Sequence, residues 1–103
     1  MTDPRARVTF DLDFDADGNP GELCVWMNPE GRDKLVKLLQ ELTPHWEHSH
    51  LLARSWGLSE LELDEVAYRD GAQVLGAVKL LLRLDEWDAQ FAPHVLTEQP
   101  DTN

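Results

Sequence analysis

The segment Val8-Thr9-Phe10-Asp11-Leu12-Asp13-Phe14-Asp15 decides the fold, because apolar and polar side chains alternate along its whole length. A period of two residues is typical of a β-strand that has one face on the hydrophobic core and the other in water. We therefore predict a strand over residues 8–15 with its four apolar side chains on the core. Its solvent face carries Thr9, Asp11, Asp13 and Asp15.

The residues after this strand predict a hairpin and then a helix. The run Asp17-Gly18-Asn19-Pro20-Gly21 is rich in turn formers, and a second strand follows from Glu22 to Met27. Asn28 is a favoured N-cap and Pro29 a favoured first helical residue, so a helix begins here and ends before Pro44. Its apolar stripe should lie across the inner face of the sheet. The stripe consists of Leu35, Leu38, Leu39 and Leu42.

The second half of the chain predicts further strands. Residues 48–54 and 61–63 alternate in the manner of short strands, and Asp70-Gly71 is a hairpin signal. The apolar run from Val74 to Leu84 fits either a strand or a helix. We favour a strand, because a helix would place Gly76 in its interior.

Together these segments predict an α+β fold. We expect an antiparallel sheet of about four to five strands with one main helix packed on one face. Residues 85–88 favour the start of a short C-terminal helix. A chain of 103 residues suits a single domain, with an ordered core over about residues 7–92 and a loose tail over 93–103.

The charge of the chain limits its partners. Twenty Asp and Glu residues oppose nine Lys and Arg, which gives a formal net charge of −11. Such a surface repels nucleic acid and anionic lipid and attracts basic proteins, although acidity also serves solubility alone. The single cysteine, Cys24, excludes an internal disulfide. The polar first residues, and the lack of an apolar run of roughly 18 residues, favour a cytoplasmic protein without a membrane segment.

Two short motifs suggest metal binding, and each has a structural explanation. Asp13, Asp15 and Asp17 match the first half of an EF-hand calcium loop, but Cys24 stands where the bidentate glutamate belongs. His48 and His50 share one face of a strand, a spacing compatible with zinc or iron, yet the sequence names no third ligand. We assign no catalytic residue, no metal ligand and no cofactor.

Tryptophan is unusually frequent for so short a chain. Four are present, and Trp46 and Trp56 flank the histidine strand where partial exposure is expected. Tryptophan surrounded by carboxylates is a plausible anchor for a protein partner, and capping the ends of a small core is the competing explanation.

Several motifs occur in a recognisable order. The helix opens with Met27-Asn28-Pro29-Glu30-Gly31, and the next strand reads Glu47-His48-Ser49-His50-Leu51-Leu52. A Trp56-Gly57 turn precedes Glu60-Leu61, and the last strand contains Ala77-Val78-Lys79-Leu80. In this order, residues 8–84 resemble the Imm32-type immunity proteins, which are encoded beside polymorphic bacterial toxins. The resemblance implies binding and neutralisation of a toxin domain, and the residues from Asp85 onward depart from the family pattern.

Three functional hypotheses follow. The first is a non-enzymatic inhibitor that docks its acidic surface on a cognate basic toxin domain. The second is a small metal-dependent enzyme or sensor that uses His48 and His50. The third is a homo-oligomeric accessory domain, such as a homodimer, formed through an edge strand in residues 74–84. For the first hypothesis the candidate partner-binding residues are Asp11, Asp13, Asp15, Asp17, Trp46, His48, His50 and Trp56.

Overall fold

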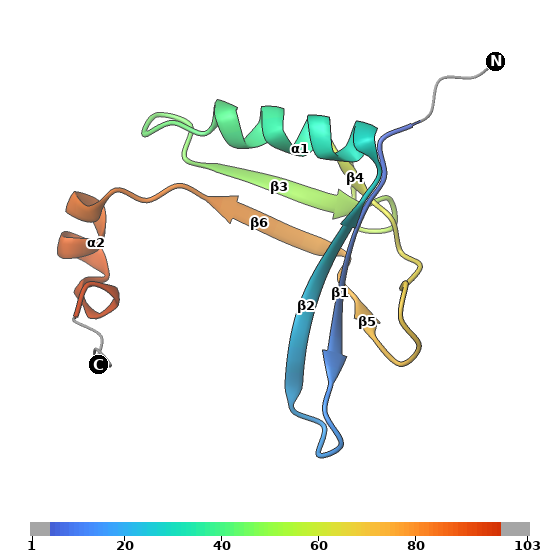
Figure 1. Ribbon diagram of the computed structural model, residues 1–103. Helices are drawn as coiled ribbons and strands as arrows, with labels where there is room; N and C mark the ends of the chain where they lie inside the picture. Colours follow the sequence, from blue (N-terminus) through green and yellow to red (C-terminus); the bar gives the residue numbers. More distant parts are fainter. Residues whose placement is uncertain (1–4, 98–103) are drawn as a thin grey trace.

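The computed structural model describes residues 5–97 and has an α+β fold (Figure 1). The predicted loose tail lies outside the described residues from residue 98 onward. In chain order the elements are β1 (Val8–Phe14), β2 (Pro20–Met27), α1 (Pro29–Glu41), β3 (His48–Ala53), β4 (Glu62–Leu63), β5 (Gln73–Val74), β6 (Ala77–Leu81), α2 (Asp85–Phe91) and the 3₁₀ helix η1 (Pro93–Val95).

The strands form one mixed sheet rather than the antiparallel sheet that the sequence predicts. The strand order is β2-β1-β4-β3-β6, and β5 also pairs with β1. The pairs β1–β2, β1–β5 and β3–β6 are antiparallel, whereas β4 runs parallel to both β1 and β3. The prediction of antiparallel pairing was wrong for β4, because alternation of side chains identifies a strand without fixing the direction of its neighbours.

The hydrophobic core lies between α1 and one face of the sheet. The register places Val8, Leu63 and Ala53 side by side on three neighbouring strands, and all three are buried. Leu38 of α1 is buried against this layer and Leu35 packs on it, so the predicted packing of the main helix on one face is confirmed, whereas Leu39 of the predicted stripe is 50% exposed. The remaining core residues are Phe10, Leu51 and Leu61.

Helix α1 begins where the sequence predicts, and its cap also anchors β1. The Asn28 side-chain oxygen accepts hydrogen bonds from the backbone N–H groups of Gly31 at 2.7 Å and Arg7 at 2.9 Å. The Asn28 amide group donates to the Arg5 carbonyl at 2.9 Å. One N-cap residue therefore satisfies the helix start and fixes the chain that enters β1.

Residues 64–72 cross the opposite face of β1, which corrects the predicted hairpin at Asp70-Gly71. A turn does form there, with the Ala72 N–H bonded to the Arg69 carbonyl at 3.2 Å. However, the strands on either side of it, β4 and β5, both pair with β1. The turn therefore closes a loop over the face of β1 that the sequence predicts to lie in water.

The apolar run of residues 74–84 is extended but not continuous. It contributes to β5 and β6, with Gly76 between the two strands, and β6 is the last strand in the order of the sheet. The strand assignment is thus confirmed for these parts, although β6 ends at Leu81. The short terminal helix is also confirmed as α2, which Figure 1 shows standing apart from the sheet. Within residues 5–97, no helix combines the length and apolar character needed to cross a membrane.

Candidate functional site

The sheet face opposite α1, called here the open face, carries four of the eight candidate residues, Asp11, Asp13, His48 and His50. Side chains that are paired across neighbouring strands point to the same side of a sheet. Thr9 and Asp11 pair with Trp26 and Cys24, and the histidines of β3 pair with β6 residues on that same side. The open face therefore includes Thr9, Asp11, Asp13, Trp26, His48, His50, Glu62 and Lys79.

Asp11 is buried, which corrects its predicted place on a solvent face. Its side chain has no exposed surface, and its Oδ1 atom accepts hydrogen bonds from Arg69 Nη2 at 2.7 Å and Trp26 Nε1 at 3.1 Å. Its Oδ2 atom accepts from the Tyr68 N–H at 3.0 Å. Burial alone would raise the pKa of this carboxyl, but the bonds from Trp26, Arg69 and Tyr68 outweigh burial and hold the pKa below its ordinary value. Thr9, predicted on the same solvent face, is also buried.

Arg69 holds this region together, and the sequence analysis missed it. Besides Asp11, its guanidinium binds Asp13 Oδ2 at 2.9 Å and the Glu22 carbonyl at 3.1 Å. It therefore joins β1, β2 and residues 64–72. One signal was present in the sequence: Arg69 is the only Lys or Arg between Arg54 and Lys79.

The other aspartates shape the β1–β2 turn instead of forming a calcium loop. Asp15 Oδ1 accepts from the backbone N–H groups of Asn19 at 2.8 Å and Asp17 at 2.9 Å, and the bond from the Asn19 backbone is the main reason that the pKa of Asp15 is lowered. Asp13 Oδ1 accepts from the Glu22 N–H at 2.6 Å. The bonds of Asp15 are local ones that turn-forming aspartates commonly make, whereas the Asp13 bond joins β1 to β2. The predicted row is thus divided: Arg69 binds Asp11 and Asp13, while Asp15 and Asp17 are exposed near the hairpin tip.

The aromatic candidates lie along β3 and at its two ends. Trp46 and Trp56 are 68% and 65% exposed, so both are available to a partner. A hollow of about 340 Å³ is lined by Trp46, His48 and their neighbours His45 and Glu47. At the other end, a Cβ atom at Gly76 would collide with the Trp56 ring, so the glycine makes room for the tryptophan.

The two histidines of β3 contact each other. The rings of His48 and His50 are arranged edge to face with their centroids 5.3 Å apart. Among residues 5–97, no group of three or more His, Cys, Asp or Glu side chains is placed to hold a metal ion. The pair therefore has no third ligand from the described part of the chain.

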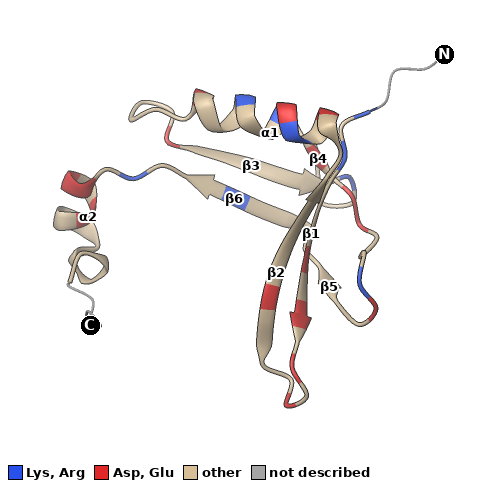
Figure 2. Ribbon diagram, viewed as in Figure 1, with Lys and Arg blue, Asp and Glu red and all other residues tan. Residues whose placement is uncertain are grey.

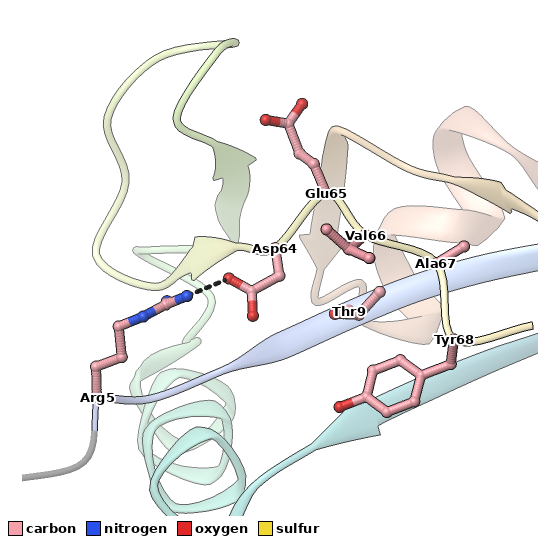
Figure 3. Close-up of a pocket in the computed structure, with 7 residues that line it drawn as sticks. All are labelled: Arg5, Thr9, Asp64, Glu65, Val66, Ala67 and Tyr68. Atoms are coloured by element: carbon pink, nitrogen blue, oxygen red, sulfur yellow. Dashed lines mark hydrogen bonds and ion pairs between the residues drawn. The ribbon is translucent and has the colours of Figure 1, made fainter.

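A cleft of about 550 Å³ lies where residues 64–68 pass over β1 (Figure 3). Arg5 Nη2 reaches across its edge to Asp64 Oδ1 at 3.0 Å, and Glu65 accepts a hydrogen bond from the Ser55 hydroxyl at 2.6 Å. The Tyr68 ring stacks on Trp26 with a centroid distance of 4.4 Å. The lining consists of Arg5, Thr9, Asp64, Glu65, Val66, Ala67 and Tyr68. Carboxylates, a hydroxyl and apolar groups thus meet in one concave site.

The surface also exposes many large apolar side chains. Beside the tryptophans, Leu58 is 90% and Val66 78% exposed, and both belong to the loops around β4. Apolar residues gathered beside polar ones are a feature of protein-binding surfaces.

Comparison with known protein families, curated proteins and solved structures finds no match to this chain. The similarity to Imm32-type immunity proteins therefore stays a prediction from the motifs. What can be concluded from the geometry is a polar open face with exposed tryptophans at both ends of β3 and a carboxylate-lined cleft beside β1.

Proposed function

We propose that this chain is a non-enzymatic immunity protein of the cytoplasm that binds and neutralises a basic bacterial toxin domain through its open face. The observation that carries the proposal is the exposure of Trp46 and Trp56 on an acidic molecule, at the two ends of the strand that presents His48 and His50. Exposed tryptophans supply the apolar contact of a binding surface, and carboxylates supply long-range attraction to a basic partner.

The charges available for this attraction differ from those that the sequence predicts. Asp11 and Asp13 are neutralised by Arg69, and Asp64 and Glu62 are paired with Arg5 and Arg54. In the described part of the chain, six exposed carboxylates at the hairpin tip, in the 64–72 loop or on α2 have no ion-pair partner: Asp15, Asp17, Glu65, Asp70, Asp85 and Glu86. Figure 2 shows this acidic colouring at the hairpin and on α2. These groups, rather than Asp11, are the ones expected to steer a basic partner.

The test is binding to the toxin domain encoded beside this protein. The two proteins should co-purify, and Trp46→Ala and Trp56→Ala should each speed dissociation by about tenfold or more. The double variant Asp15→Asn/Asp17→Asn should slow association several-fold at low salt. Its matched control is Asp33→Asn/Glu41→Gln, which removes two exposed carboxylates from α1 on the other side of the sheet and should leave association unchanged. A neighbouring gene that encodes a metabolic enzyme, or the absence of a complex, would contradict the proposal.

A second candidate function is homodimerisation through β6. This strand is at the edge of the sheet, and Leu81 at its end is 47% exposed. Exposed edge strands readily pair with another chain. Sedimentation at micromolar concentration tests this, because a dimer that dissociates in a Lys79→Pro variant would favour it.

A further inference from the structure

We propose that the cleft beside β1 is a receptor site for an arginine side chain of the basic partner, and that Arg5 occupies its mouth while the partner is absent. The identity of the partner rests on the proposed function, whereas the cation site does not. Nothing in the sequence motifs points to this cleft, because its lining comes from the segment before β1, from β1 itself and from residues 64–68.

The resident Arg5 shows what chemistry the cleft accepts. Its guanidinium lies 3.0 Å from Asp64 Oδ1, with the Arg5 side chain 60% and the Asp64 side chain 21% exposed. An ion pair that is this open to water contributes little stability and exchanges easily. The Arg5 backbone is nevertheless held, because its carbonyl accepts the Asn28 amide at 2.9 Å. Arg5 is thus a tethered occupant whose side chain can leave while its backbone stays in place.

The rest of the cleft offers acceptors that Arg5 does not use. Thr9 is only 2% exposed, and its hydroxyl makes no hydrogen bond within residues 5–97, although Figure 3 places it in the lining of the cleft. Because no buried side-chain polar atom of the described residues lacks a hydrogen-bond partner, this hydroxyl is open to the cleft, where a bound ligand can reach it as an acceptor. Among residues 5–97, Asp64 Oδ2 likewise makes no hydrogen bond or ion pair, and Glu65 adds a second carboxylate to the lining.

These acceptors favour a guanidinium over other cations. Its planar group carries five N–H donors, enough for a carboxylate and a hydroxyl together. Its face also packs on aromatic rings, and the stacked Tyr68 is held in the cleft wall by Trp26. Once Arg5 has left, Asp64 and Glu65 give the cleft two uncompensated negative charges.

The experiment titrates the protein with N-acetyl-arginine amide while backbone NMR shifts are followed. We expect shifts to concentrate at Thr9 and residues 64–68. Arg5→Ala should bind the probe about tenfold more tightly than the unaltered chain, because the competing guanidinium is gone. The matched control is Arg7→Ala. This variant also removes one positive charge, but Arg7 lies two residues after Arg5 and its side chain does not line the cleft. The affinity of Arg7→Ala for the probe should stay within about twofold of that of the unaltered chain.

Two further variants test the contacts themselves in the Arg5→Ala background. Asp64→Asn should lower the affinity for the probe by about tenfold. Thr9→Val keeps the shape of the buried side chain and removes a hydroxyl that has no protein partner within residues 5–97. It should therefore lower the affinity for the probe without lowering the midpoint of thermal unfolding. N-acetyl-citrulline amide has nearly the same shape as the probe without its charge, and it should not bind.

The proposal is overturned if Arg5→Ala and Arg7→Ala bind alike, if the citrulline probe binds as well as arginine, or if the shifts lie away from the cleft. Failure of the toxin domain to bind would overturn the proposed function and leave these results untouched. Conversely, a toxin complex that forms equally well with Asp64→Asn would overturn the assignment of the partner's arginine to this cleft.

Discussion

At the scale of single residues, the ion pair between Asp11 and Arg69 determines how the open face is built. The Asp11 side chain is fully buried, and the Arg69 side chain is 24% exposed. A buried charge is tolerated only when its partners are complete, and here one guanidinium and two N–H groups complete them. The pair therefore makes residues 64–72 an integral part of the sheet face.

Replacing Arg69 with methionine should destabilise the protein severely. The apolar side chain leaves the buried Asp11 carboxylate without its cation, which is far more harmful than loss of a surface ion pair. We expect the midpoint of thermal unfolding to fall by about 10 °C or more. The control is Arg32→Met, which removes an exposed ion pair with Asp33. It should lower the midpoint of thermal unfolding by about 2 °C or less. Equal falls of the unfolding midpoint in the two variants would show that the buried ion pair contributes no more stability than the exposed one.

The lowered pKa of Asp11 predicts the direction of the acid sensitivity. The carboxyl of the unfolded chain takes up its proton near the ordinary value of 3.8, whereas the folded chain does so only at lower pH. The unfolded state then binds more protons, so the stability due to Asp11 is complete above about pH 4 and is lost as pH falls through the folded pKa.

Urea denaturation at a series of pH values measures this contribution. We expect Asp11→Asn to be less stable than the unaltered chain at pH 7 and to lose less stability on acidification, so that the two curves converge at low pH. Curves that stay parallel from pH 6 to pH 2.5 would mean that Asp11 keeps no depressed pKa in the folded protein.

At the scale of elements, the start of α1 depends on its contact with the strand before it. A Cβ atom on Gly31 would collide with the Arg7 carbonyl, which is backbone that cannot easily move aside. Gly31 is itself buried in the first turn of the helix. The residue is therefore required by tertiary packing, although helix propensity alone would favour alanine there.

Gly31→Ala should accordingly destabilise the protein by about 2 kcal/mol instead of stabilising it. Lys34→Ala is the control, because residue 34 is exposed in the same helix and alanine is an equally good helix former there. Urea unfolding compares the two variants. A Gly31→Ala protein as stable as the Lys34→Ala protein would show that the helix and β1 can separate without cost.

At the scale of the whole molecule, exposed apolar side chains characterise the surface as much as its negative charge does. Trp46, Trp56, Leu58 and Val66 are each more than 60% exposed, while only seven hydrophobic residues of the described range 5–97 are buried in the core. A small core with large apolar groups left outside is the expected state of a protein that completes its burial on a partner.

This exposure should be detectable in the free protein. We expect the native chain to bind the uncharged dye Nile red, and to bind it less in the double variant Trp46→Ser/Trp56→Ser. A neutral dye is chosen because the net charge of −11 would repel an anionic one. Dye binding that is weak and unchanged in the variant would indicate that the two tryptophans are shielded in solution.

By itself, the sequence determined the local features of this protein. The alternation in residues 8–15, the turn residues after it and the Asn28-Pro29 cap identify β1, β2 and α1, since backbone geometry and capping act between near neighbours. The tertiary structure alone decided the direction of β4, the burial of Asp11 and the cleft of Thr9 and Asp64. The first depends on the pairing of Leu63 with Val8, and the other two on residues 64–72 folding back over β1. These are contacts between segments more than 50 residues apart, which no local period can encode.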